Sequence, residues 1–216
     1  MNYDSVPLRD FKELNDWETV IFVYQSALKQ VETKIDILNG EFQHRHKYNP
    51  IEHVKSRIKT PESIVKKPER HGYESSIENM VRYVNDIAGI RISCSFTSDI
   101  YLIADMISKQ NDLTILARRD YMKNPKKSGY RSYHMLVTTP VFLSDSIIDT
   151  KVEIQIRTVA QDFWATLEHK MHYKFEGDGP DYITKELREC ARYVAELDTR
   201  MEELNNENPE IWKIIR

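Results

Sequence analysis

Two carboxylates stand at positions from which a β-sheet can bring them together. Asp86 directly precedes a segment of alternating apolar and polar residues (88–96), and Glu153 lies on the polar side of a second such segment (151–157). If these segments are neighbouring strands, the two carboxylates can share one Mg²⁺ ion, which is usually bound by one or two carboxylates and completed by substrate phosphates. Alternatively, Asp86 is a helix-end or turn residue, and Glu153 belongs to a solvated sheet face or pairs with Arg157.

Two basic clusters provide the positive charge that phosphate groups need, on a chain with a net charge of −3. The first cluster consists of Lys55, Arg57, Lys59, Lys66, Lys67 and Arg70. The second consists of Arg118, Arg119, Lys123, Lys126, Lys127 and Arg131. The sequence contains no glycine-rich phosphate loop, so arginine and lysine side chains would have to hold the phosphates. Each charge-assisted hydrogen bond contributes about 1.5–3 kcal/mol, so three or four can hold a nucleoside triphosphate. On pattern alone, a solvated surface explains the first cluster equally well.

An aromatic residue follows the second basic cluster. Gly129 permits a backbone conformation that other residues avoid, and Tyr130 directly after it can offer its ring to a nucleobase, with stacking worth about 1–3 kcal/mol. The alternative is a tyrosine of the core or of a pocket rim. Further along, Phe163 and Leu167 have the spacing of core residues on a helix, and Trp164 is also expected in the core rather than as a base platform.

Hydrophobic spacing predicts the elements that position these residues. Helices are expected over residues 17–38, 51–58, 63–67, 77–84, 98–110 and 159–175, and from 182 onward. Strands are expected over residues 88–96, 113–117, 133–139 and 151–157. Asn15 or Asp16 would cap the first helix and Gly40 would end it, while Ser75 and Glu78 form a capping box. The expected fold class is α/β (α+β), a mixed sheet of about five strands flanked by helices.

Length and composition fit one domain with a core of its own. The chain has 216 residues, of which 40% are hydrophobic and 30% charged. Cys94 and Cys190 are far apart, which excludes a disulfide framework and a thiolate zinc site. No apolar run approaches the length needed to cross a membrane, and the first residues do not resemble a signal peptide, so we expect a cytoplasmic location.

Four sequence blocks, in this order, resemble the synthetase domain of the RelA/SpoT-homologue superfamily. They are Asp86–Ile92 (DIAGIRI), Gly129–His134 (GYRSYH), Glu153–Thr158 (EIQIRT) and Phe163–His169 (FWATLEH). The similarity extends from about Asn49 to Glu203, and the length is similar to that of the single-domain small alarmone synthetases of Gram-positive bacteria. The resemblance implies one synthetase domain over residues 1–216, with a core at about 49–176 and helical extensions at 1–48 and 177–216.

The resemblance also implies an activity, the transfer of pyrophosphate from ATP to the 3′-hydroxyl of GDP or GTP. Asp86 and Glu153 would hold Mg²⁺, and Glu153 would be the base for the hydroxyl. The other matching positions are Arg57 and Arg91 beside the ATP adenine; Lys59, Ser63, Lys67 and Arg70 at the ATP phosphates; Tyr130 at the guanine; Arg119, Lys126 and His134 near the acceptor phosphates; and Asp162 and Glu168 beside the guanine site. The family further suggests a homotetramer with terminal helices in the contacts, no membrane and no obligatory nucleic-acid partner.

Departures from the family and competing functions define what has to be tested. The chain has no His-Asp dipeptide, so we expect no hydrolase activity. Asp162 replaces an asparagine found in another branch, and residues 117–120 fit neither acceptor pattern of the long members, so the choice between GDP and GTP stays open. The alternatives are a non-catalytic module that binds RNA or nucleotides and a nucleotidyltransferase that attacks the α-phosphorus, although no Asp-x-Asp pair supports the latter.

Overall fold

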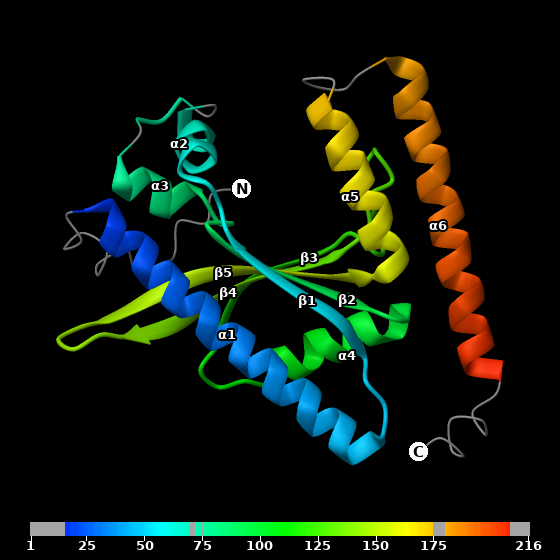
Figure 1. Ribbon diagram of the computed structural model, residues 1–216, viewed down its shortest axis with the longest axis horizontal. Helices are drawn as coiled ribbons and strands as arrows, with labels where there is room; N and C mark the ends of the chain where they lie inside the picture. The colour runs from blue at the N-terminus through cyan, green and yellow to red at the C-terminus, as the bar shows by residue number, and fades with distance from the viewer. Residues whose placement is uncertain (1–15, 70–71, 75, 175–179, 208–216) are drawn as a thin grey trace.

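The computed structural model describes residues 16–69, 72–74, 76–174 and 180–207 (Figure 1). Its elements, in chain order, are α1 (Trp17–His46), β1 (Ile51–Ile58), α2 (Pro61–Glu69), α3 (Ile77–Tyr83), β2 (Ala88–Cys94), α4 (Thr97–Ser108), β3 (Thr114–Asp120), β4 (Tyr133–Phe142), β5 (Ile147–Thr158), α5 (Val159–Lys174) and α6 (Asp181–Glu207). Among these residues, no helix combines the length and the apolar character that crossing a membrane requires.

The five strands form one sheet in the order β1-β2-β5-β4-β3. Strands β2 and β5 are parallel, whereas the other three neighbouring pairs are antiparallel. The expected mixed sheet of about five strands flanked by helices is therefore confirmed. Strand β2, which Asp86 precedes, and strand β5, which contains Glu153, are direct neighbours in the sheet.

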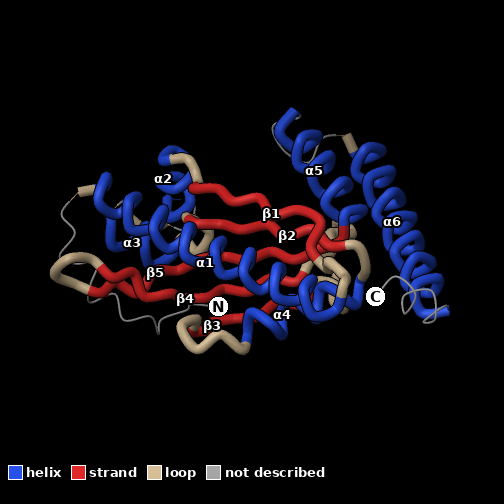
Figure 2. The backbone as a smooth tube through the Cα atoms, turned by 60° about the horizontal axis from the view of Figure 1, so that its bottom comes forward, coloured by secondary structure: helices blue, strands red, loops and turns tan. Residues whose placement is uncertain are grey.

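One face of the sheet is sealed by helices. Ile90, Ile92, Ile154 and Ile156 alternate along β2 and β5, are at most 1% exposed and belong to one core with residues of α1 and α4. Figure 2 shows α1 lying across the strands, with α4 beside it. Because side chains of a strand alternate between its faces, the residues between these isoleucines project from the opposite face.

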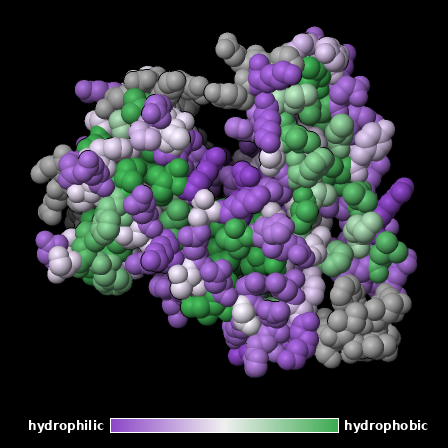
Figure 3. All heavy atoms as spheres, in the orientation of Figure 1, coloured by the Kyte–Doolittle hydropathy of each residue, from purple (hydrophilic) through white to green (hydrophobic). Residues whose placement is uncertain are grey.

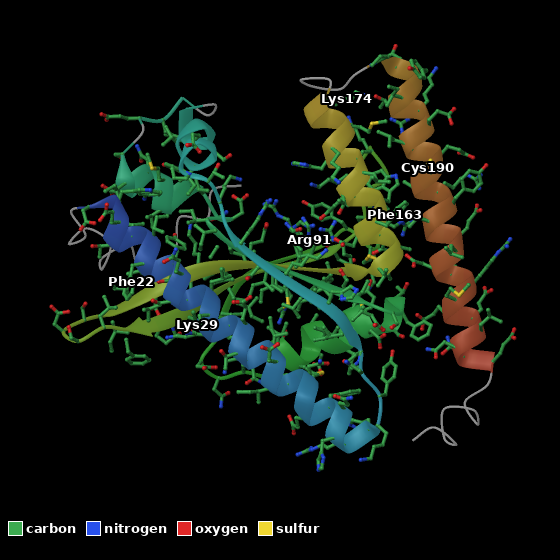
Figure 4. All side chains as sticks on the ribbon, in the orientation of Figure 1. Phe22, Lys29, Arg91, Phe163, Lys174 and Cys190 are labelled. Atoms are coloured by element: carbon green, nitrogen blue, oxygen red, sulfur yellow. The ribbon has the colours of Figure 1, made fainter. Side chains whose placement is uncertain are left out.

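The opposite face is flanked at its two ends. In Figure 1, α2 and α3 stand at one end of the strands, and α5 and α6 stand at the other. Arg91, in the middle of β2, lies between these two groups of helices (Figure 4). The helices thus leave a polar sheet surface between them.

The segment from Ile51 to Ile58 is a strand, so its prediction as a helix was wrong. It pairs with β2 along its whole length, and a bulge between Ile51 and His53 interrupts the pairing. Arg57 is therefore on a strand and not on a short helix beside α2. The correction matters for the site, because a strand places Arg57 on the same sheet as Glu153.

The helix termini also differ in part from expectation. Asp16 caps α1 as predicted and accepts a hydrogen bond from the Thr19 backbone nitrogen at 2.7 Å. Helix α1 continues through Gly40 and ends at His46, and Lys47, with a positive φ of 54°, is its C-cap. The side chain of Ser76 caps α3, whereas Ser75, the predicted cap, lies outside the described residues.

Candidate active site

A row of polar side chains crosses the sheet on its open face. Lys55 pairs with Arg91, Arg91 with Gln155, Gln155 with His134, and His134 with Arg119, so the row runs through all five strands. Residues paired in this way project from the same face. The register thereby gathers Arg91, His134 and Arg119, which lie on three different strands.

The neighbouring row contains a gap at Gly89, beside the cavity that both carboxylates line. Arg57 pairs with Gly89, and Gly89 pairs with Glu153. Gly89 has no side chain, and a Cβ atom built there would have no atom of the described residues within 4 Å. The space is part of a cavity of about 190 Å³ whose walls include Arg57, Asp86, Arg91 and Glu153. The structure therefore brings Asp86 and Glu153 to one cavity.

Asp86 is held at the cavity wall by a lysine. The Lys59 Nζ lies 2.6 Å from the Asp86 Oδ2, and about one fifth of each side chain is exposed. The Lys59 backbone nitrogen also donates to the Ile87 carbonyl oxygen at 2.8 Å, which ties the end of β1 to the start of β2. A cation of the first basic cluster thus lies directly beside the first carboxylate.

Glu153 is ionised by its surroundings. Burial raises the pKa of Glu153 and the charge of Asp86 adds to this, but hydrogen bonding and charge from His134, together with a hydrogen bond from Gln155, outweigh both and leave its pKa below the ordinary value. The Gln155 Nε2 donates to Glu153 Oε2 at 2.8 Å, and the His134 Nδ1 lies 3.6 Å from Glu153 Oε1. The carboxylate is therefore charged at neutral pH.

The donor set at this cavity fits Mg²⁺. Within the described part of the chain, no three His, Cys, Asp or Glu side chains gather as a metal cluster. Zinc sites need three or four such ligands, whereas Mg²⁺ commonly uses one or two carboxylates and takes its other ligands from phosphates and water. Two carboxylates in the wall of an open cavity match the second arrangement.

A second cavity, of about 390 Å³, lies beside the first and is lined mainly by polar and charged side chains. Arg57, Arg91 and Gln155 line both cavities. The second cavity is also lined by Lys126, Ser128, Tyr130, His134, Arg157, Ala165, Thr166, Glu168, His169 and Lys170. Figure 3 shows hydrophilic residues in the hollow between the two helical groups. Ligands in the two cavities would lie side by side.

Tyr130 is fixed in the wall of the larger cavity. Its hydroxyl shares a 2.9 Å hydrogen bond with the His134 Nε2, and the Lys126 Nζ lies 4.7 Å from its ring centroid. Burial raises the pKa of Tyr130, so the ring stays neutral at physiological pH. His134 thus contacts both the aromatic ring and, through Nδ1, the carboxylate of Glu153.

Arg157 is a site residue that the sequence interpretation missed. Its side chain is 1% exposed, and its guanidinium carbon lies 5.9 Å from the Tyr130 ring centroid. Burial lowers the pKa of Arg157, although a guanidinium stays protonated. Its Nε lies 3.2 Å from Asp162 Oδ1, so Arg157 pairs with Asp162 and the alternative of a pair with Glu153 was wrong. The sequence feature that could have identified Arg157 is its place on the polar side of a clearly predicted strand, the side that also carries Glu153.

The remaining predicted site residues are distributed around the cavities. Asp162 faces Arg157 and also Arg91, whose Nη1 is 3.4 Å away, and it does not line the larger cavity, whereas Glu168 does. Arg119 is exposed, beside His134 in the sheet. Ser63 is exposed on α2. The side chain of Lys67 and all of Arg70 lie outside the described residues.

Helix α5 is attached to the protein along one side. Trp164 is buried as expected, and its Nε1 donates to the Leu187 carbonyl oxygen at 2.8 Å. Phe163 and Leu167 were expected in the core, but Phe163 is 65% exposed and Leu167 is 42% exposed. Together with the exposed Val159 and Met171 they form a line of apolar side chains with a spacing of four residues. Figure 3 shows apolar side chains gathered along α5.

Fold and site together define a nucleotide-binding enzyme that handles phosphate groups. Residues 56–178 match the family described as the region found in RelA / SpoT proteins. Two proteins of Bacillus subtilis (strain 168) are similar over most of their length. GTP pyrophosphokinase YwaC is 45% identical over 188 residues, which is 87% of this chain and 90% of YwaC. GTP pyrophosphokinase YjbM is 35% identical over 191 residues, 88% of this chain and 89% of YjbM.

Solved structures agree with these sequence relatives. The crystal structure of small alarmone synthetase 2 from B. subtilis matches with a TM-score of 0.81 at 43% identity, over 88% of this chain and 99% of that one. Small alarmone synthetase 1 bound to its product pppGpp matches with a TM-score of 0.83 at 34% identity, over 90% and 98%. The chain therefore belongs to the RelA/SpoT family, in its small alarmone synthetase branch. This confirms the resemblance and favours an enzyme over a non-catalytic module.

Proposed function

We propose that this chain transfers the pyrophosphoryl group of ATP to the 3′-hydroxyl of GDP or GTP and releases AMP and ppGpp or pppGpp. The observation that carries the proposal is the meeting of Asp86 and Glu153 at one cavity, which shares walls with a larger, cation-lined cavity containing Tyr130. The solved relatives include one complex with the product pppGpp and one with AMPCPP, which supports an adenine nucleotide as donor and a guanine nucleotide as acceptor.

Charge and position provide most of the catalysis on the donor side. Asp86 and Glu153 would hold Mg²⁺, which would neutralise phosphate charge when bound. Lys59 lies at Asp86 and therefore at the edge of the same cavity, where its ammonium can face the phosphates of ATP. Arg57 and Arg91 line both cavities, so their charges lie where donor and acceptor meet.

Glu153 is the base on the acceptor side. The oxygen of the 3′-hydroxyl forms a bond to the β-phosphorus of ATP, the bond from that phosphorus to the α-phosphate oxygen breaks, and the proton passes to the Glu153 carboxylate. The guanine stacks on Tyr130, which holds the hydroxyl in line with the phosphorus. His134, between Tyr130 and Glu153, keeps the base and the stacking ring in one geometry. Phosphoryl transfer of this kind depends chiefly on such positioning.

We also propose that the protein works as a homotetramer in the cytoplasm. The support is the apolar line on α5 and a second group of exposed apolar residues on α6, namely Tyr193, Leu197, Met201 and Leu204. Exposed apolar side chains that gather along one helix are typical of protein contacts. Light scattering after size exclusion tests the assembly, and Phe163→Glu should yield smaller species if α5 is in the contact. An unchanged mass would remove α5 from it.

The activity is tested by one incubation with ATP, Mg²⁺ and either GDP or GTP, followed by anion-exchange chromatography. We expect AMP and a guanosine tetra- or pentaphosphate in equal amounts. Release of pyrophosphate in place of AMP would indicate attack on the α-phosphorus. Absence of both products would favour the binding module, and RNA affinity that falls steeply with salt would then support that function.

A further inference from the structure

The loop that carries Tyr130 approaches helix α6 closely at Gly129, at the edge of a cavity that the loop and α6 line together. Gly129 has a φ of 92°, and a Cβ atom built on it would lie 2.5 Å from the Cβ of Ala191. Such a distance is far shorter than an ordinary contact between carbon atoms. The loop is closed by two backbone hydrogen bonds, from the Gly129 nitrogen to the Lys126 oxygen at 2.8 Å and from the Lys126 nitrogen to the Tyr130 oxygen at 3.1 Å. A shift of α6 toward the loop would therefore move Tyr130.

The Tyr130 ring packs in the same place. Ala191, Trp164 and Ala165 form a small buried cluster, separate from the main core, against which Tyr130 packs. The Trp164 Nε1 donates to the Leu187 carbonyl oxygen of α6 at 2.8 Å. Helix α6 thus supports the acceptor side of the site through Ala191 and through Trp164, although α6 contributes no residue to the wall of the larger cavity.

Helix α6 is itself fixed at a distance from this cluster. Asp198 is buried and accepts hydrogen bonds from the Thr158 Oγ1 at 3.0 Å and the Gln161 Nε2 at 2.7 Å. One turn further, the Glu202 Oε2 accepts from the Ser98 backbone nitrogen at 3.0 Å. These bonds tie α6 to the end of β5, to the start of α5 and to α4, so its position along the loop is set by the rest of the domain.

We propose that α6 positions the guanine nucleotide, with Ala191 as a positioning residue that acts through Gly129 on Tyr130. The proposal rests on the proposed function, in which Tyr130 stacks on the acceptor base. Ala191 does not touch a substrate. Its methyl group fills the space that a side chain at position 129 would need, and it thereby fixes where the ring of Tyr130 stands. If Ala191 has this role, changes at the contact should alter the KM for the guanine nucleotide and not the KM for ATP. A merely stabilising role would alter both or neither.

The test is a cycle of two substitutions at the contact. Gly129→Ala adds the methyl group that collides with Ala191, whereas Ala191→Gly removes the group with which it collides. We expect Gly129→Ala to raise the KM for the guanine nucleotide about tenfold, as partial loss of stacking predicts, while the KM for ATP stays within about twofold. Ala191→Gly alone should have a small effect, and the double variant should recover most of the lost acceptor affinity.

Two matched controls isolate the contact. Gly72 also has a positive φ, 77°, but a Cβ atom there would meet no atom of the described part of the chain within 4 Å, so Gly72→Ala introduces the backbone strain without a collision of this kind. Cys190 precedes Ala191 on the exposed side of α6 (Figure 4), so Cys190→Gly introduces the same helix-weakening residue without touching the loop. Neither control should change the KM for the guanine nucleotide.

The outcomes are separable from those of the proposed function. If the wild-type protein makes no AMP, the proposed function is refuted. The GDP affinities of the single and double variants could still be compared by calorimetric titration. A double variant as impaired as Gly129→Ala would overturn the role of Ala191, and so would equal increases in both KM values. If Gly129→Ala fails to fold, Ala191→Val adds bulk from the helix side, where its branched side chain has one preferred rotamer. An unchanged acceptor KM in Ala191→Val would then overturn the proposal.

Discussion

Replacing Glu153 with glutamine removes the charge of the candidate base without changing its shape. In the variant, the side-chain amide oxygen can accept the hydrogen bond from Gln155, which spans 2.8 Å in the wild type, and the amide nitrogen can face His134. The fold should therefore persist. General base catalysis contributes about 10²–10⁴-fold to the rate, and the lost charge beside the phosphates adds to this. We expect kcat to fall about 10³- to 10⁴-fold, which corresponds to about 4–5.5 kcal/mol in the barrier.

The assay for this variant is AMP formation at saturating ATP, Mg²⁺ and guanine nucleotide. Calorimetric affinity for GDP and the melting temperature should stay close to wild type, because Glu153 does not line the larger cavity and reaches it only through His134 and Gln155. Glu18→Gln, an exposed change in the first turn of α1, is the matched control and should retain full turnover. Turnover of Glu153→Gln within about tenfold of wild type would refute its role as the base.

Three further changes probe the metal, the stacking ring and the buried acid of α6. Asp86→Asn should raise the Mg²⁺ concentration needed for half-maximal turnover, because a neutral amide is a weaker ligand; an unchanged Mg²⁺ titration would count against a metal role. Tyr130→Ala should raise the KM for the guanine nucleotide about 5- to 100-fold and leave that for ATP unchanged, whereas equal effects would make Tyr130 merely structural. Burial raises the pKa of Asp198 from 3.8 to about 6, so the folded state binds the proton more tightly and stability falls as pH rises across this window. Asp198→Asn should flatten that decline in melting temperature, with Asp99, whose pKa burial also raises to about 6, accounting for the rest; an unchanged slope would exclude Asp198.

The central strands could be predicted from sequence because their pattern is local. Val152, Ile154 and Ile156 are buried, and the residues between them, Glu153 among them, face the other side. A strand with one face in the core must alternate in this way, whatever its neighbours are. The same argument located β2, and the order of the strands was left open because it depends on pairing between distant segments.

The edge strand β1 misled the sequence interpretation for a physical reason. Its better-buried residues are Ile51, Val54 and Ile58, and their spacing of three and four residues is that of one side of a helix. The bulge between Ile51 and His53 shifts the alternation of side chains between the two faces by one residue. Ile51 and Val54 therefore both face the core, although they are three residues apart. Neither the bulge nor the pairing with β2 can be read from the strand alone.

Helix positions failed where packing overrides local preference. Gly40 was expected to end α1, but the helix continues because a glycine costs only about 1 kcal/mol and the helix is anchored by the residues that it buries against the sheet. Phe163 and Leu167 have core spacing but project from a side of α5 that nothing covers among the described residues. Periodicity shows that a helix has an apolar side, and it does not show what that side meets.

The candidate site and the core are determined by the same register. A shift of β5 by one residue would turn Glu153 toward α1 and α4 and expose Ile154 and Ile156, because each shift of one exchanges the two faces of a strand. Burying an unpaired carboxylate costs several kcal/mol, so the hydrophobic face that closes the core also holds Glu153 on the open side beside Gly89. Selection for a packed core therefore maintains the geometry of the carboxylate pair, and a core variant that loosens β5 should lower turnover before it unfolds the protein.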